Sequence, residues 1–176
     1  LSGRTVAVLG AAYRADADDT RNAPGLALAR VLQEAGATVR VHDPFVRPTD
    51  VNLRAAVAPE AFSHDLATTL HGADVAIICV AHAPYRTALQ ATLASVPGLQ
   101  LVMDGANVVS LEALRATGRQ ARGVGRGAQA PSPALVQTVA AAFRAVEVAV
   151  ANEVEALVEW YDATYRGPLE ACLLYT

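Results

Sequence analysis

Apolar runs alternate with helix-like segments over the first two thirds of the chain. Five runs rich in branched apolar residues predict strands, at TVAVLG (5–10), ATVRVHD (37–43), DVAIICVA (74–81), LQLVMDG (99–105) and ARGVG (121–125). Apolar residues at helical spacing predict four helices between them, at 23–36, 60–71, 84–95 and 110–117. Strands that alternate with helices form parallel sheets with right-handed crossovers. The pattern therefore predicts an α/β, Rossmann-like, doubly wound parallel sheet of about five strands.

The last third of the chain has a different pattern. The segment AQAPSP is typical of a linker, and from Pro133 to about Tyr161 apolar residues recur every three or four positions. This spacing predicts a long amphipathic C-terminal helix of roughly 40 Å, at 1.5 Å per residue. We expect two units, an α/β domain over 1–127 and a linker with a helical tail over 128–176. Because the apolar stripe exceeds what one small domain needs to cover, it predicts a homodimer through residues 133–161.

Composition and charge narrow the class of protein. Of 176 residues, 53% are hydrophobic and 18% are charged, as expected for an α/β protein whose strands are covered on both faces. The net charge of −3 argues against a nucleic-acid partner. The sequence has neither an apolar run of membrane-spanning length nor a secretory signal pattern, so we expect no membrane and a cytoplasmic location. The initial Leu1 in place of methionine is typical of a piece of a longer protein or of an expression boundary.

The loop after the first predicted strand departs from a dinucleotide-binding turn. Only Gly10 of the three expected glycines is present, and Asp16, Asp18 and Asp19 follow it. Three carboxylates near a helix start would repel a diphosphate that lacks a cation, so an NAD site is not expected at this loop. Asp43 ends the second predicted strand, where it is either a ribose-binding acid or part of an ordinary Asp-Pro turn. We favour the turn.

Five separated motifs carry a resemblance to a known family. They are GAAYRADADDTRNAP, VRVHDPFV, IICVAHAPYR, VMDGANVV and GVGRG, in that order. Together they resemble the C-terminal nucleotide-sugar-binding domain of the UDP-glucose/GDP-mannose dehydrogenase family, over about residues 3–127. The surroundings of His82 are more similar to the N-acetylmannosamine branch of the family. The resemblance implies a UDP-sugar or related nucleotide sugar as ligand.

The resemblance also implies candidate site residues. Tyr13 matches an aromatic residue of the family's loop, and Arg14 matches a lysine that approaches the nucleotide. An arginine keeps that charge and adds a planar fork for phosphate. Arg21 matches a residue that faces the interdomain cleft, where the dinucleotide lies, so it is also the candidate cofactor contact. Asp104 and Asn107 match the family's Asp-Gly-Arg-Asn turn.

Other positions depart from the family or have a simpler interpretation. Ala106 stands where the turn supplies an arginine, which implies one lost phosphate or ribose contact. For Asp18 and Asp19 we favour an ion network within the loop over a contact with ligand. His42 replaces a tyrosine, and we expect a packed side chain there.

The chemical groups needed for oxidation of a sugar alcohol are absent from the sequence. The chain has no lysine, no glycine fingerprint and no glycine-rich cysteine segment. Its two cysteines, Cys79 and Cys172, form no disulfide framework, and Cys172 has no neighbour that would lower its pKa. We therefore assign no catalytic residue, no metal site and no cofactor to this chain, although the parent family uses NAD.

Two functional hypotheses remain open. The first is the UDP-sugar-binding domain of an NAD-dependent sugar-nucleotide 6-dehydrogenase, which does not turn over alone. The second is a non-catalytic scaffold derived from that domain, which assembles through its tail helix. Retention of Tyr13, Arg14 and Arg21 favours the first, whereas Ala106 favours the second.

Overall fold

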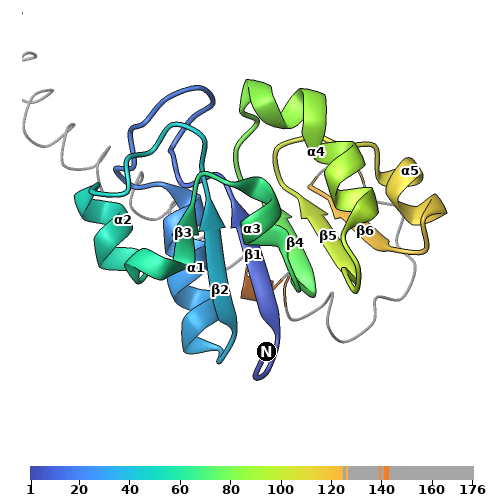
Figure 1. Cartoon of the computed structure of the whole chain (residues 1–176), viewed down its shortest axis with the longest axis horizontal. Helices are drawn as coiled ribbons and strands as arrows, with labels where there is room; N and C mark the ends of the chain where they lie inside the picture. Colours follow the sequence, from blue (N-terminus) through green and yellow to red (C-terminus); the bar gives the residue numbers. More distant parts are fainter. Residues whose placement is uncertain (125, 127–138, 140, 143–176) are drawn as a thin grey trace, which may run out of the picture.

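Six parallel strands form one sheet in the computed structural model, which describes residues 1–124, 126, 139, 141 and 142 (Figure 1). The strands are β1 (Thr5–Leu9), β2 (Thr38–His42), β3 (Phe62–Ser63), β4 (Val75–Ile78), β5 (Leu101–Asp104) and β6 (Gln120–Gly123). Their order is β3-β2-β1-β4-β5-β6, and every neighbouring pair is parallel. The predicted Rossmann-like α/β fold is confirmed.

Short helices connect the strands, and the sequence explains where they start. They are α1 (Pro24–Glu34), α2 (Val51–Ala56), the 3-10 helix η1 (Pro59–Ala61), α3 (Leu66–Leu70), α4 (Ala83–Ser95) and α5 (Leu111–Ala116). A proline lies in the first turn of α1 and of α4, where its missing N–H costs nothing. Asp50, Asp65 and Ser110 cap α2, α3 and α5 by accepting backbone N–H bonds. These caps fix the starts of the three shortest α-helices.

The predicted helix over 60–71 is wrong in its first half. That segment contains the end of η1, then β3, and only then α3. Phe62 and Ser63 pair with the end of β2, and Asp65 caps a fresh helix at Leu66. Pairing along an edge strand, which cannot be read from local spacing, overrides the helical pattern here.

Alternation along the strands divides the core into two layers. Val6, Val8 and Ile77 pack on the face covered by α1 and α2. Ala7 and Ile78 point to the opposite face, which α3, α4 and α5 cover. Figure 1 shows α4 and α5 over the β4, β5 and β6 half of the sheet. Both faces are therefore buried, as the continuous apolar runs predict.

A close crossing of two backbones positions the start of α1. Gly10 directly follows β1 and has φ 104°, a conformation that favours glycine. A Cβ atom on Gly25 would lie 2.1 Å from the carbonyl oxygen of Gly10. The first turn of α1 can approach the end of β1 this closely only because residue 25 has no side chain.

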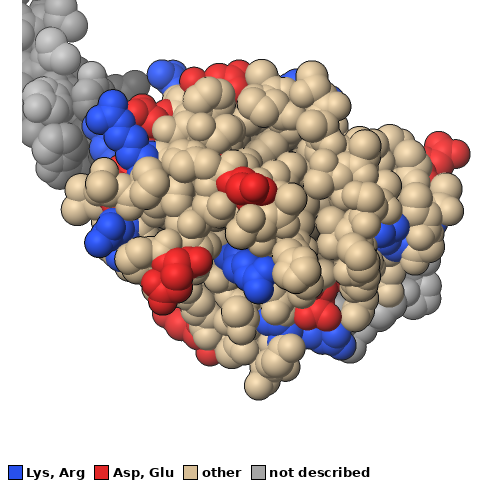
Figure 2. Space-filling model, viewed as in Figure 1, with Lys and Arg blue, Asp and Glu red and all other residues tan. Residues whose placement is uncertain are grey.

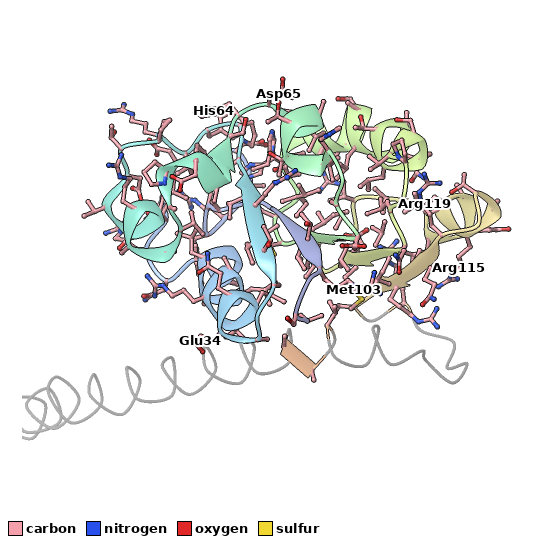
Figure 3. All side chains as sticks on the ribbon, turned by 60° about the horizontal axis from the view of Figure 1, so that its bottom comes forward. Glu34, His64, Asp65, Met103, Arg115 and Arg119 are labelled. Atoms are coloured by element: carbon pink, nitrogen blue, oxygen red, sulfur yellow. The ribbon has the colours of Figure 1, made fainter. Side chains whose placement is uncertain are left out.

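Three residues of the predicted tail helix belong to the described part of the chain. Residues 139, 141 and 142 are helical. Val139 is fully buried in the layer that contains Met103, which Figure 3 labels, and Ala142 packs against the same layer. The remainder of the 133–161 helix and the predicted dimer contact lie outside the described residues. Among the helices that the structure describes, none is long and apolar enough to cross a bilayer.

Candidate functional site

The strand order reverses between β1 and β4, and this places a candidate site at the carboxyl edge of the sheet. The chain leaves β1 toward α1 on one face and leaves β4 toward α4 on the other. In open α/β sheets, ligands bind outside the carboxyl ends of the strands near such a reversal. The loops after β1, β2, β4 and β5 all end at this edge.

Asp43 is the buried centre of this edge. Its Oδ2 accepts N–H bonds from Ala11 (2.8 Å) and Ala12 (3.0 Å), and its Oδ1 accepts from Phe45 (2.9 Å) and Val46 (3.1 Å). Burial alone would raise the pKa of this carboxyl, but hydrogen bonds from His82 and the two turn amides outweigh it and hold the pKa at about 2. The turn interpretation of Asp43 is confirmed, and the side chain ties the loop after β1 to the turn after β2.

His82 joins the same centre from the loop after β4. It is fully buried, with Nε2 3.0 Å from Asp43 Oδ2. Its Nδ1 accepts the backbone N–H of Asp16 at 2.9 Å. An Nδ1 that accepts a hydrogen bond carries no proton, so the ring is neutral and Nε2 donates to Asp43.

Asp16 contacts the loop after β4 at the edge where the strand order reverses, and 49% of its side chain is exposed. It has a left-handed backbone, with φ 57°, and its Oδ1 accepts the N–H of Ala83 (2.8 Å) at the first turn of α4. The positive end of α4 thus already holds a carboxylate of the same chain. Asp16 therefore ties the long loop after β1 to the start of α4.

Tyr13 and Arg14 belong to the same loop after β1. Both are exposed, and 54% of the surface of Tyr13 is open to solvent. The backbone beneath them is held, because the N–H of Tyr13 donates to the carbonyl oxygen of Asp19 at 2.7 Å. Two candidate ligand contacts therefore project from a fixed backbone.

Arg21 and Asp19 form an ion pair within the loop. The guanidinium donates from Nε (2.9 Å) and from a terminal nitrogen (2.7 Å) to the two carboxylate oxygens. Side-chain and backbone hydrogen bonds from Arg21 lower the pKa of Asp19 to about 2. The predicted internal network is confirmed for Asp19. Asp18 is exposed and joins no ion pair among the residues that the structure describes.

Asp104 is a second buried carboxylate at this edge. Its Oδ1 accepts the N–H of Ala106 (3.0 Å), and its Oδ2 accepts from Val108 (2.8 Å) and Val109 (2.9 Å). The guanidinium of Arg126 also donates to Oδ2. With this many partners, Asp104 shapes the turn after β5.

Asn107 is carried by that turn. It is exposed and has a left-handed backbone, with φ 57°. Because β1 and β5 both pair with β4, Asn107 and Tyr13 lie on loops from the two sides of one strand. Arg126, which donates to the carbonyl oxygen of Val109 at 2.9 Å, was visible in the sequence only as part of GVGRG. The site residues thus come from two loops at one edge.

A buried polar pair lies beside the Asp43 centre. His42 Nδ1 is 2.6 Å from the hydroxyl of Tyr85, and His42 Nε2 is 3.1 Å from the carbonyl oxygen of His64. Burial lowers the pKa of His42, which keeps its ring neutral. The expectation of a packed histidine at the end of β2 is confirmed.

Neither a reactive thiol nor a metal cluster accompanies the site in the described chain. Removal from water raises the pKa of Cys79 to about 12, so its thiol stays protonated at neutral pH. The described residues contain no group of three His, Cys, Asp or Glu side chains arranged to hold a metal ion. Cys172 lies outside them.

An open cavity lies elsewhere, on the α3 side of β2 and β3. It has a volume of about 430 Å³ and is lined by Arg40, Glu60, Ala61, Ser63, Thr68, Thr69 and His71. None of the candidate site residues lines it. Figure 2 shows that acidic and basic side chains are scattered singly over this face.

Comparison with known proteins decides the family. Residues 7–111 match the UDP-glucose/GDP-mannose dehydrogenase family, UDP binding domain. This chain belongs to that family. The match contains Tyr13, Arg14, Arg21, Asp104 and Asn107, and it ends before β6.

Relatives of this UDP binding domain are whole dehydrogenases. A UDP-N-acetyl-D-mannosamine dehydrogenase of Pyrococcus horikoshii is 30% identical over 122 residues, which are 69% of this chain and 25% of the relative. A UDP-glucose 6-dehydrogenase of Bacillus subtilis is 28% identical over 77% of this chain and 30% of its own. The chain therefore spans about a quarter of the length of these relatives.

Solved structures agree with the family and the fold. An NDP-N-acetyl-D-galactosaminuronic acid dehydrogenase from Methanosarcina mazei is 29% identical with a TM-score of 0.59, covering 71% of this chain and 25% of its own. A UDP-N-acetyl-D-mannosamine dehydrogenase from Pyrococcus horikoshii is 29% identical with a TM-score of 0.56, covering 72% and 26%. Both comparisons rest on one domain of a larger enzyme.

Proposed function

We propose that this chain binds a UDP-sugar at the carboxyl edge of its sheet, as the UDP binding domain of an NAD-dependent sugar-nucleotide 6-dehydrogenase, and does not turn over alone. The observation that carries the proposal is the loop after β1. Instead of forming a glycine turn, it ties Asp16 to the start of α4 and leaves Tyr13 and Arg14 exposed to solvent. In a member of this family, a basic and an aromatic side chain on a fixed loop suit a nucleotide diphosphate.

Each candidate residue has a distinct proposed role. Arg14 neutralises the diphosphate and Tyr13 packs against the nucleotide. Arg21 faces the neighbouring dinucleotide domain, with part of its charge balanced by Asp19. Asn107 supplies a neutral polar contact from the opposite loop. Asp104 acts indirectly, because its oxygens hold the turn that carries Asn107.

Replacing Arg14 with alanine should weaken UDP binding by roughly 1.5 to 3 kcal/mol, the usual range for hydrogen bonds to charged groups. The matched control is Arg30→Ala, because Arg30 is also an exposed arginine but lies on α1, away from the loop. Isothermal titration calorimetry of both variants measures the change in Kd. If Arg14→Ala binds UDP as the intact chain does, Arg14 has no place in the site.

The second candidate function, assembly through the tail, rests on the apolar stripe that continues beyond Val139. Val139 is buried on its own sheet, but a helix that runs to Tyr161 would extend well past it. We infer that the rest of the apolar stripe packs against the same stripe of a second copy about a two-fold axis. Left exposed, this row of apolar side chains would form a hydrophobic patch that promotes association.

The intact chain is accordingly expected to be a dimer at micromolar concentration. A Phe143→Asp, Val150→Asp double variant should be monomeric, because it places charges in the middle of the stripe. Light scattering compares the two. A monomeric intact chain would mean that the helix folds back onto its own domain.

A further inference from the structure

His82 occupies an unusual place for a buried histidine. It precedes the first residue of α4 and has no exposed surface. Its ring lies between those of Phe45, at a centroid distance of 5.2 Å, and Tyr85, at 5.4 Å. If the ring served only for packing, an apolar ring of the same size would suffice. Both ring nitrogens of His82 make hydrogen bonds, however.

The two nitrogens of His82 hold two different parts of one loop. Through Nε2 the ring donates to the same Asp43 oxygen that accepts the N–H groups of Ala11 and Ala12. Through Nδ1 it accepts the N–H of Asp16, whose carboxylate returns to the N–H of Ala83. The loop is therefore attached to this buried centre at Ala12 and again at Asp16.

Residues 13–15 form an exposed arch between these two attachments. The N–H of Tyr13 donates to Asp19, while among the described residues no backbone hydrogen bond holds Arg14. The direction of the arch thus depends on where Asp16 is held. His82 holds it by a hydrogen bond that joins residues 66 positions apart in the sequence.

We infer that His82 is a positioning residue, which through Asp43 and Asp16 sets the place of Tyr13 and Arg14 and thereby the affinity for a nucleotide sugar. The inference rests on the proposed function for its ligand. The part of the inference that concerns structure, that His82 holds Asp16 in place, does not depend on the proposed function.

The chemistry of the ring explains why histidine suits this role. A neutral imidazole presents a donor on one side and an acceptor on the other. Phenylalanine would keep the shape but leave a lone pair of the buried Asp43 and the partly buried N–H of Asp16 without partners. Glutamine also carries one donor group and one acceptor, so it restores part of the pattern.

The test compares His82→Phe and His82→Gln with Tyr85→Phe as matched control. Tyr85→Phe also removes a buried hydrogen bond beside the ring, but that bond goes to His42 and not to the loop. Amide hydrogen exchange at Asp16 is measured first, without nucleotide. We expect exchange about tenfold faster or more in His82→Phe, partly restored in His82→Gln, and unchanged in Tyr85→Phe.

Binding of UDP is then measured on the same variants. We expect His82→Phe to raise the Kd about tenfold, with partial recovery in His82→Gln and no change in Tyr85→Phe. If His82→Phe does not fold, His82→Gln and His82→Asn carry the comparison with the intact chain. Unchanged Asp16 exchange in the folded variants, or an equal effect of Tyr85→Phe, would overturn the inference. Failure of the intact chain to bind UDP would instead contradict the proposed function. Amide hydrogen exchange at Asp16 would still decide whether His82 positions the loop.

Discussion

Replacing Asp43 with asparagine is expected to destabilise the fold by about 3 to 5 kcal/mol, the range for removing one partner of a buried charged network. The fully buried carboxylate accepts four backbone N–H bonds and one from His82, and an amide group can accept on only one of its two atoms. Urea or thermal unfolding of the variant measures the change in the free energy of unfolding.

The matched control for this substitution is Asp50→Asn. Asp50 accepts the N–H groups of Asn52 and Leu53 at the start of α2, and asparagine is an equally good residue at that capping position. We expect a loss below about 1 kcal/mol there. An Asp43→Asn variant no less stable than the control would refute the role of Asp43 as the buried centre.

We also expect the ionisation of Asp43 to make the free energy of unfolding depend on pH. Its folded pKa of about 2 lies below the unfolded value of about 3.9, so the folded state favours the ionised form. This preference contributes about 2 to 3 kcal/mol above pH 4, and it is lost as the pH falls from about 4 toward 2. The unfolding free energy of Asp43→Asn should therefore depend less steeply on pH in this interval.

The second large effect is expected for Gly25→Ala. The new Cβ would lie 2.1 Å from the carbonyl oxygen of Gly10, and the nearest atoms are backbone, so no flexible side chain can move aside. We expect a loss of about 3 kcal/mol or more, the upper end of the costs of overpacking, despite the better helix propensity of alanine.

Gly72→Ala separates this clash from backbone strain. Gly72 has φ 65° but nothing within 4 Å of its Cβ position, so only the left-handed conformation of the backbone is penalised, by roughly 1 to 2 kcal/mol. Thermal unfolding of the two variants gives the comparison. A Gly25→Ala variant as stable as Gly72→Ala would show that α1 can retreat from β1 at little cost.

Local pattern was sufficient to predict most of the fold. β1, β4 and β5 are covered on both faces, and this is why their sequences are nearly continuous apolar runs, whereas β2 (TVRVH) alternates and has an exposed Thr38. The structure adds β3, which is two residues long and lies at the edge of the sheet. α2 also escaped prediction, because its six residues begin with the exposed Val51 and depend on the Asp50 cap.

The site could be predicted only in part, because its contacts are long-range. Tyr13 and Arg14 follow from a local motif. The bonds of Asp16 to His82 and Ala83 join segments that no spacing rule connects. Likewise, the pairing of Asp104 with Arg126 depends on the adjacency of β5 and β6. A carboxylate in the sequence does not reveal whether it faces a ligand or its own backbone.

Calorimetric titration of the folded chain with UDP tests the central claim most directly. The proposal predicts saturable binding of one UDP per chain, lost in large part in Arg14→Ala and retained in Arg30→Ala. A chain that shows the expected unfolding transition yet takes up no UDP at millimolar concentration would contradict it.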